Sequence, residues 1–436
     1  MTDSTGPEPP AGPPQESIAP RGLAEPQQPP ERHRSTGAIA ALAVGIIAIL
    51  AGGAFAVSQL AGQSTSPEDA IEKLFRAVAD EDALGVLEAL PPSERDVLEG
   101  PLQDIVGELK RLDILSADAD LESLAGVEAQ VDDLELSSQR IRDGLAEVRI
   151  DRGTLTTSAD PNRLPLGGFV RDVGGDDLSQ ARPTGPEEED LRSDGADDVM
   201  IAVREDDRWY FSVWYTVAEL ARRESDAPLP DPAQRVNANG AGSAEEAVDR
   251  FLRAAVSLDL RRMIELLPPD EARALHDYAP LFLDDAQDAG ADLRRSVDVD
   301  ITRLDLRTAG QGDDRALVQI ERLAFDAEIR EENLRITYRD GCATLAPLTG
   351  RGRPERFCPG DFGEGAPELF DQFLPEGVDA PQLDVAQPAL GLATVRSDGK
   401  WYVSPTRTVL DNVLATLKVL DRDDLRALRD LFEEFE

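Results

Sequence analysis

Residues that could do chemistry are scarce in this chain of 436 residues, which holds only two histidines and two cysteines. Zinc fingers, iron–sulfur clusters, multi-histidine metal sites and most Cys-His or Ser-His-Asp catalytic sets need more of these residues than the sequence provides. The sequence also has no phosphate-binding loop, dinucleotide fingerprint or nucleophile elbow. We therefore expect no cofactor, no metal site and no assignable catalytic residue.

The two cysteines, Cys342 and Cys358, are separated by 15 residues in a stretch rich in Gly, Pro and Arg. This spacing is unlike the Cys-x-x-Cys of redox-active pairs. In an oxidising compartment, a disulfide that closes a loop of this length would stabilise the fold by about 3 kcal/mol in the chain-entropy model. An apolar segment described below is expected to place this part of the chain outside the cell. We therefore predict the disulfide, with two buried free thiols as the alternative.

Candidate acid–base residues occur together in one place, where His276, Asp277 and Tyr278 follow one another in a predicted helix. An isomerase-like site would need an Asp base and a Tyr or protonated Asp donor that converge on one pocket. Side chains two residues apart on a helix do not share a face, so His276 and Tyr278 cannot both point into one cavity. We interpret His276 as a surface or half-buried helix residue.

Two Trp-Tyr pairs, Trp209-Tyr210 and Trp401-Tyr402, could stack on a ligand. Neighbouring positions on a strand face opposite sides of a sheet, so one member of each pair should face the core and the other the outside. Core packing is therefore favoured over a binding site for both pairs.

An acidic insertion within residues 171–198 contains Asp176-Asp177 and the run Glu187–Asp190. Carboxylate oxygens are the ligands that Ca²⁺ prefers, but the insertion lacks the alternating Asp/Asn spacing and later Glu of a calcium-binding loop. We interpret it as a solvated loop at a sheet edge.

The charge balance is strongly acidic, because 86 Asp and Glu against 45 Lys and Arg give a formal net charge of −41. Affinity for nucleic acid comes mainly from Lys and Arg that neutralise phosphates, so we exclude a nucleic-acid partner. Cationic partners or divalent ions would be attracted instead. A mean hydropathy of −0.33 indicates a globular protein, and the chain length indicates two or three folding units.

The N-terminal region combines a Pro-rich tail with an apolar segment. Residues 1–36 have no aromatic residue and cannot bury a core, which predicts a disordered tail. Residues 38–57 are uncharged and would span about 30 Å as a helix, so we predict a transmembrane helix within 37–60. Because Arg32 and Arg34 precede it, the positive-inside rule places the N-terminus in the cytoplasm and the remaining domains outside. A cleaved signal peptide is the alternative.

An internal repeat organises the rest of the chain. Residues 66–94 read SPEDAIEKLFRAVADEDALGVLEALPPSE, and residues 243–271, at an offset of 177, read SAEEAVDRFLRAAVSLDLRRMIELLPPDE. Apolar residues at i, i+3, i+4 and i+7 predict a first helix in each copy, and two further helices follow. The expected capping residues of the three helices, taken in pairs, are Ser66 and Ser243, Asp82 and Asp259, and Ser93 and Asp270.

Strands follow the helices in each copy. Alternating apolar residues recur at an offset of 170, with Leu134, Leu136, Val148 and Ile150 matching Leu304, Leu306, Val318 and Ile320. Asp398-Gly399 predicts a tight turn in the last hairpin, which carries a Trp-Tyr pair and precedes a closing helix. We assign the first repeat to 66–224, a linker to 225–242, the second repeat to 243–410 and an amphipathic helical extension to 411–436.

The repeated unit resembles the nuclear transport factor two-like superfamily, also described as cystatin-like or SnoaL-like. The resemblance is carried by the openings AIEKLFRA and AVDRFLRA, at Ala70–Ala77 and Ala247–Ala254, and by the endings DDRWY and DGKWY on the last hairpins. It implies three N-terminal helices packed on a strongly curved antiparallel sheet, which form a cone with a pocket between helices and sheet. An anchor followed by such domains resembles single-pass bacterial envelope proteins.

The sequence therefore predicts an α+β fold class: an N-terminal disordered tail and one transmembrane helix, then two cone-like units of N-terminal helices packed on a curved antiparallel sheet. We expect a non-catalytic, extracytoplasmic binding or scaffolding protein held at the cell membrane by residues 38–57. Its partner would be the lipid bilayer together with an envelope protein or a small apolar ligand. The alternatives are a hydrolase, dehydratase or isomerase using one cone pocket, and a transmembrane transducer acting through its Pro-rich cytoplasmic tail.

Overall fold

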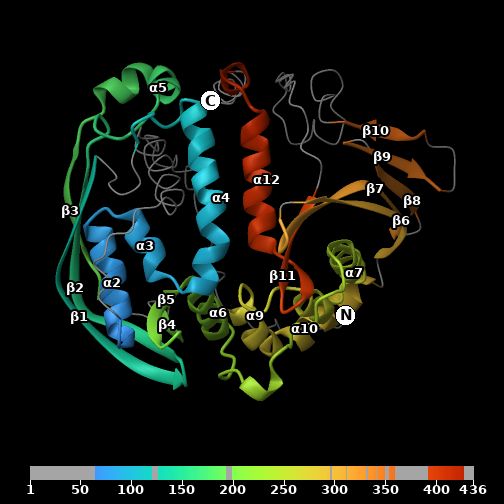
Figure 1. The fold of residues 1–436 in the computed structure, drawn as a ribbon, viewed down its shortest axis with the longest axis horizontal. Helices are drawn as coiled ribbons and strands as arrows, with labels where there is room; N and C mark the ends of the chain where they lie inside the picture. The colour runs from blue at the N-terminus through green and yellow to red at the C-terminus, as the bar shows by residue number, and fades with distance from the viewer. Residues whose placement is uncertain are drawn as a thin grey trace, which may run out of the picture.

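The computed structural model has an α+β fold with two curled antiparallel sheets (Figure 1), so this part of the expected fold class is confirmed. The structure describes residues 64–119, 126–192, 199–294, 297–310, 312–329, 332–339, 341–348, 353–358 and 391–426. The expected tail at 1–36 and transmembrane segment at 37–60 lie outside these residues.

The transmembrane part of the expected fold class is corrected by the structure. None of the described helices combines the length and the apolar character needed to cross a bilayer. The longest of them, α4 (Pro92–Arg111), carries charged residues along most of its turns. Such a helix is amphipathic, and its apolar face packs on the rest of the protein.

Three helices open the first unit: α2 (Pro67–Ala79), α3 (Ala83–Ala89) and α4. Ser66 Oγ accepts a hydrogen bond from Asp69 N at 3.1 Å, and Asp69 Oδ2 accepts one from Ser66 N at 3.0 Å, which completes a capping box. Asp82 caps α3 as predicted. The predicted cap by Ser93 is wrong, because α4 begins at Pro92, a residue that suits the first turn, and Ser93 lies inside the helix. Ser93 Oγ instead donates to Glu205 Oε1 at 2.7 Å.

The first sheet follows, in the order β1-β2-β4-β5, with β3 paired to β2 as well. Its strands are β1 (Val127–Arg142), β2 (Leu145–Ala159), β3 (Thr184–Asp190), β4 (Met200–Glu205) and β5 (Arg208–Ser212). Helix α5 (Gly168–Gln180) connects β2 to β3, and α6 (Val213–Glu224) closes the unit. The core of the unit forms where Ile71 of α2 packs against Val148 and Ala202 of the sheet.

Within the acidic insertion, residues 171–192 are described and contain a helix and a strand rather than the solvated loop that we predicted. Its backbone runs through α5, and Glu187–Glu189 pair with Leu155–Thr157 of β2 in antiparallel register. All seven residues of β3 are exposed. Backbone hydrogen bonds to the sheet therefore hold the strand in place while its carboxylates stay in water, a combination that charge composition does not reveal.

Helices also open the second unit: α7 (Ala244–Val256), α8 (Leu260–Glu265), α9 (Arg273–Tyr278), the 3₁₀ turn η2 (Ala279–Leu281) and α10 (Leu283–Arg294). Ser243 caps α7 and Asp259 caps α8, as predicted. The predicted cap by Asp270 is wrong, because α9 begins later and has no side-chain cap. Where the first unit has the continuous helix α4, which accommodates Pro101 within it, the second has the shorter segments α9, η2 and α10, with Pro280 in η2.

The second sheet has the order β10-β9-β8-β7-β11-β12, with β6 paired to β7 as well. Its strands are β6 (Val297–Gly310), β7 (Arg315–Ile329), β8 (Glu332–Arg339), β9 (Cys342–Pro347), β10 (Glu355–Phe357), β11 (Gly391–Ser397) and β12 (Lys400–Val403). Helix α12 (Pro405–Val419) follows β12, and the boundary that we assigned at 410 falls inside it. The linker between the units contains the 3₁₀ turn η1 (Pro232–Gln234).

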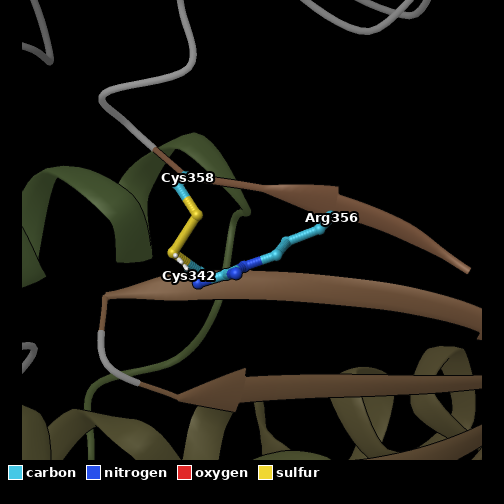
Figure 2. The surroundings of a disulfide bond; sticks show 3 residues. All are labelled: Cys342, Arg356 and Cys358. Carbon is cyan, nitrogen blue, oxygen red and sulfur yellow. Dashed lines mark hydrogen bonds between the residues drawn. A yellow bond between two sulfur atoms is a disulfide. The ribbon is translucent and has the colours of Figure 1, made fainter.

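The predicted disulfide is present and joins Cys342, at the start of β9, to Cys358, just after β10 (Figure 2). Its S–S distance is 2.01 Å. Arg356 of β10 places Nη2 3.2 Å from Cys342 Sγ. The bridge therefore ties the short edge strand β10 to the rest of the second sheet.

The two units pack through their closing helices in a reciprocal way. Helix α12 of the second unit lies along α4 of the first, and α6 of the first unit packs on α9 of the second (Figure 1). Leu414 of α12 joins Ile105 of α4 in one buried cluster, and Tyr215 of α6 joins Tyr278 of α9 in another. The units therefore share two cores, which makes their junction part of the folded structure.

The last hairpins of both units turn through two residues with positive φ. These are Asp206 (48°) and Asp207 (62°) in the first unit, and Asp398 (50°) and Gly399 (75°) in the second. Two positive φ angles are typical of a type I′ turn, whose second position strongly favours glycine. The first unit therefore carries a strained aspartate where the second has a relaxed glycine.

We expect Asp207→Gly to raise the free energy of unfolding by about 0.5–1 kcal/mol, because glycine adopts a positive φ without a steric cost. The pair between Asp207 and Arg204 is lost, but the Asp207 side chain is 91% exposed and such surface pairs contribute little. Urea denaturation measures the change. The matched reverse variant, Gly399→Asp, should lower the same free energy by a similar amount. If Asp207→Gly is no more stable than the wild type, the backbone of Asp207 is not strained.

Candidate functional site

A buried carboxylate, that of Asp277 in α9, joins the two units. The Tyr215 hydroxyl of α6 donates to Asp277 Oδ2 at 2.5 Å, and Arg142 at the end of β1 donates to the same oxygen. Arg235 of the linker places Nε 3.4 Å from Oδ1. Burial raises the pKa of Tyr215 above its ordinary value, and the charge of Asp277 adds to the shift. The phenol therefore stays protonated and remains a donor.

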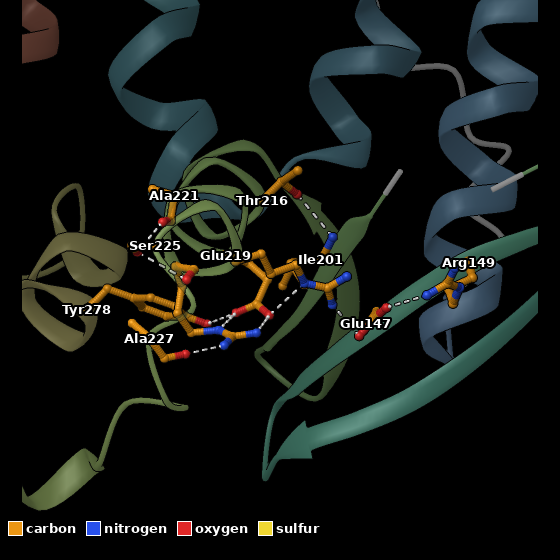
Figure 3. Close-up of polar contacts among 11 residues, drawn as sticks. Glu147, Arg149, Ile201, Thr216, Glu219, Ala221, Ser225, Ala227 and Tyr278 are labelled. Atoms are coloured by element: carbon orange, nitrogen blue, oxygen red, sulfur yellow. Dashed lines mark hydrogen bonds and ion pairs between the residues drawn. The ribbon is translucent and has the colours of Figure 1, made fainter. Parts of the chain in front are cut away.

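A second buried carboxylate, that of Glu219 in α6, also bridges the units (Figure 3). The Tyr278 hydroxyl donates to its Oε2 at 3.0 Å, Arg222 Nη2 donates to Oε1 at 2.6 Å and Arg223 Nε donates to Oε1 at 3.1 Å. Burial raises the pKa of Glu219, but these hydrogen bonds outweigh burial and the net shift is downward. Arg223 also donates to Glu147 Oε2 of β2 at 2.6 Å, which extends the network into the first sheet.

Neither buried carboxylate has the geometry of a general base. A general base needs a lone pair within hydrogen-bond reach of a substrate proton, in a site that the substrate can enter. Both oxygens of Asp277 and of Glu219 already face a hydroxyl or a guanidinium, and both side chains are buried. The network holds the units in register and does not provide the open Asp–Tyr pair of an isomerase-like site.

His276 is fully buried, so our interpretation of a surface or half-buried residue is wrong. The linker covers α9 at this point, since Val236 N donates to the His276 carbonyl at 2.9 Å and Val236 is itself buried. Burial lowers the pKa of the His276 imidazole below its ordinary value, which keeps the ring neutral. The error arose because the linker has no periodic pattern and gives no sign that it packs over a helix.

The two Trp-Tyr pairs pack in cores, as we predicted, but the expectation that one member of each pair faces outside is wrong, because both members of each pair pack against apolar residues. Trp209 lies against the cluster around Ile71, and Tyr210 packs on a different cluster. Trp401 packs on the core of the second unit, and Tyr402 is buried. None of the four lines the groove described next.

Two adjoining apolar hollows lie where α6, α9, η2 and the start of α12 meet. Their volumes are about 410 and 420 Å³, within the usual range of small-molecule pockets. The first is also lined by Trp214 and Val217 of α6, and the second by Met263 of α8. Five residues line both hollows: Leu267, Leu275, Ala279, Phe282 and Pro405. We call the two together the junction groove.

Large apolar side chains at the junction groove are open to solvent. Trp214 is 39% exposed, Val217 54% and Leu275 44%. An exposed apolar patch beside a hollow is typical of a binding site. The groove lies among helices of both units, whereas the family resemblance implied a pocket between the helices and the sheet of one cone. Its walls include η2, where the third helix of the second unit is broken.

A single charged residue, Glu271, is among the side chains that line the junction groove in the described part of the chain. Its Oε1 accepts a hydrogen bond from Thr406 N at 3.0 Å, whereas Oε2 has no hydrogen-bond partner within the described residues. The counterpart of Glu271 in the first repeat is Glu94, which uses both oxygens. Glu94 Oε2 accepts from Val213 N at 3.0 Å, and Oε1 accepts from the Ser212 hydroxyl. Each acid therefore caps the closing helix of its own unit.

Sequence reasoning missed Glu94 and Glu271 as site residues, although a signal was present. Each acid ends the aligned repeat, in PPSE and PPDE, directly after the prolines that stop the second helix. That pattern does not show where the carboxylate points, because the helix that Glu94 caps starts 119 residues later, at Val213. The predicted disulfide, by contrast, lies at the edge of the second sheet and contributes no groove residue.

Glu94 should make the stability of the protein depend on pH. Burial raises the pKa of Glu94 to about 7 from an ordinary 4.5. The folded state then holds this proton more tightly than the unfolded chain, so the free energy of unfolding falls as pH rises from about 4.5 through about 7. The loss is on the order of 3 kcal/mol.

We expect Glu94→Gln to match the wild type near pH 5 and to be more stable at pH 8. The amide resembles the protonated acid, because its oxygen can accept from Val213 N and its NH₂ can donate to Ser212 Oγ, and it cannot ionise. Urea denaturation at several pH values measures the difference. Glu108→Gln, on the same helix, is the matched control for replacing a glutamate of α4. If the free energies of unfolding of the wild type and of Glu94→Gln differ by the same amount at every pH from 5 to 8, Glu94 does not titrate in this range.

Comparisons with known proteins add no family to this picture, since no family model and no curated protein matches the chain. The function of the protein must therefore be argued from its own residues. The features that bear on it are the partnered carboxylates of the junction, the junction groove and Glu271 at its wall.

Proposed function

We propose that the chain is a non-catalytic binding protein that works outside the cytoplasm and holds a small apolar molecule in the junction groove. The observation that carries the proposal is the pair of adjoining hollows, each about 400 Å³, lined almost entirely by apolar side chains. Ligand pockets are concave and mostly apolar, and they often lie where domains meet. The buried carboxylates nearby support binding over catalysis, because they are already partnered.

The groove fits a small molecule better than a protein surface. A stable protein–protein interface buries about 800 Å² on each partner, over some 20 residues or more. The large apolar residues exposed at the groove are Trp214, Val217 and Leu275, which form a patch far smaller than that. Their position over a hollow favours a ligand that inserts into the groove.

The disulfide supports a place outside the cytoplasm. Structural disulfides persist in oxidising compartments and are rare in the cytosol, where thiols are kept reduced. Cys342 and Cys358 are bonded to each other, and together they are all the cysteines of the chain.

The proposal also assigns both units to the nuclear transport factor two-like superfamily. Support comes from the order of elements, because in each unit several helices precede an antiparallel sheet and a closing helix. The Trp-Tyr pairs that suggested the resemblance lie on the last strands, β5 and β12. In this assignment the groove is a feature of the paired units and not of one cone.

We expect Leu275→Glu to weaken binding of the hydrocarbon probe diphenylhexatriene to the full-length chain by about tenfold or more. The reason is that a carboxylate placed among apolar side chains must be desolvated when the probe enters. Binding is measured as energy transfer from Trp214 and the other tryptophans to the probe, which reports only probe close to the protein.

The matched control for this variant is Leu293→Glu on α10. Leu293 is 51% exposed, close to the 44% of Leu275, and it lines neither hollow. Probe binding should be unchanged by this substitution. Equal losses in both variants, or none in either, would place the probe outside the junction groove and remove the support for the proposal.

In cells that make the full chain, the two thiols should resist a membrane-permeant maleimide until a reductant is added. Reduction should then expose both cysteines to modification, because the chain has no others. Cys342→Ser is the control, since it leaves Cys358 without its partner and open to the reagent before reduction. Two modified cysteines per wild-type chain without reductant would overturn the proposed compartment.

A further inference from the structure

The disulfide of the second sheet has a positive charge at one of its two sulfurs. Arg356 of β10 places Nη2 3.2 Å from Cys342 Sγ, and Figure 2 shows its guanidinium beside that sulfur. The Arg356 side chain is exposed, whereas Cys342 is only 9% exposed. The bridge therefore lies at the surface, with Cys342 as its inner, cation-bound half.

The strand register places positive charge on both sides of Cys342. Arg339 of β8 pairs directly with Cys342 of β9, and paired residues carry their side chains on the same face of a sheet. Arg356 of β10 pairs with Thr344, two residues from Cys342, so it lies on that face as well. Because β9 runs between β8 and β10, Cys358 is one strand further from Arg339 than Cys342 is.

This asymmetry decides which sulfur an external thiol would attack. A thiolate that attacks a disulfide bonds to one sulfur and releases the other as a thiolate, and release is faster when the departing thiolate is more stable. A neighbouring arginine stabilises a thiolate through its charge. The better leaving group is therefore Cys342 Sγ, so attack falls on Cys358. Burial acts in the same direction, because Cys342 is buried and Cys358 is partly exposed.

We propose that Cys358 is a modification site for thiols, with Arg356 as the residue that stabilises the departing Cys342 thiolate. The attacking thiolate forms a bond with Cys358 Sγ, the bond between Cys358 and Cys342 breaks, and Cys342 Sγ leaves with the electron pair. The thiol is oxidised to a mixed disulfide and Cys342 is reduced, so the thiol is the one reactant that the step needs. Once the bridge opens, β10 is held to β9 by the backbone pairs of its three residues. This site is separate from the junction groove.

The test is exchange of the full-length protein with 2-mercaptoethanol, a neutral thiol that the charge of the protein does not attract or repel. After short reaction times, excess N-ethylmaleimide stops the exchange and alkylates the released cysteine. Peptide mass spectrometry then identifies which cysteine carries mercaptoethanol. We expect mercaptoethanol on Cys358 with alkylated Cys342 to exceed the reverse arrangement by about fivefold or more.

Arg356→Gln should slow the initial exchange by about threefold or more and at least halve the preference for Cys358, because the departing thiolate loses its cation. A looser β10 would speed exchange, so a slower rate cannot come from a damaged fold. Arg356→Lys keeps the charge and should restore most of the rate. Arg353→Gln, at another exposed arginine of the same loop, is the matched control and should keep both wild-type values.

Three results would overturn the inference. They are a wild-type bridge that does not react with the thiol, equal modification of both cysteines in the wild type, and an exchange rate in Arg356→Gln no slower than in Arg353→Gln. None of them bears on the junction groove, because the disulfide lines neither hollow.

Discussion

The cost of removing carboxylates from water is the constraint on which the junction depends. Asp277 and Glu219 are buried between the units, and their donors come from both sides of the junction. Leaving a buried charge without its partners costs several kcal/mol, whereas an intact pair contributes little net stability against an apolar equivalent. The network therefore fixes the relative position of the units more than it stabilises them. Any movement that separated α6 from α9 would leave Asp277 without the Tyr215 hydroxyl.

The groove follows from a difference between the two copies. In the first unit α4 runs unbroken, and its face is covered along its length by α12. In the second unit the corresponding segment is interrupted at η2, and the shorter helix α6 packs on the short helix α9. Apolar side chains that a continuous helix pair would cover, among them Leu275 and Phe282, then line a hollow. The packing of α12 on α4 thus gives a closed core, whereas the packing of α6 on α9 leaves an open groove.

Features set by local patterns could be predicted from the sequence, and features set by distant partners could not. The capping residues Ser66 and Ser243, the strands around Leu136 and Leu306 and the turn at Asp398 all depend on residues a few positions apart. The disulfide was predictable because the chain has only two cysteines and one possible pairing.

The site itself depends on contacts that composition and spacing do not encode. The burial of His276 requires the linker to fold over α9, and the strand at Glu187–Glu189 requires an open edge on β2. The burial of His276 and the strand at Glu187–Glu189 both involve polar segments, and the position of each segment depends on the element that it packs against. The transmembrane expectation rested on length and hydropathy alone, which describe a segment and not its partners.

The change from Val213 in the first unit to Pro405 in the second shows how a duplicated unit can lose a backbone donor with little loss to its fold. Proline suits the first position of a helix, whose N–H has no partner within the helix, so α12 loses nothing by the change. The lost hydrogen bond is instead a cost to Glu271, because the start of α12 now supplies a donor to Oε1 and none to Oε2. In a site exposed to water that cost would disappear into hydration, but Oε2 of Glu271 is buried and has no partner within the described residues. The position that separates the two copies chemically is therefore also a position that lines both hollows of the junction groove, since Pro405 belongs to the wall of each.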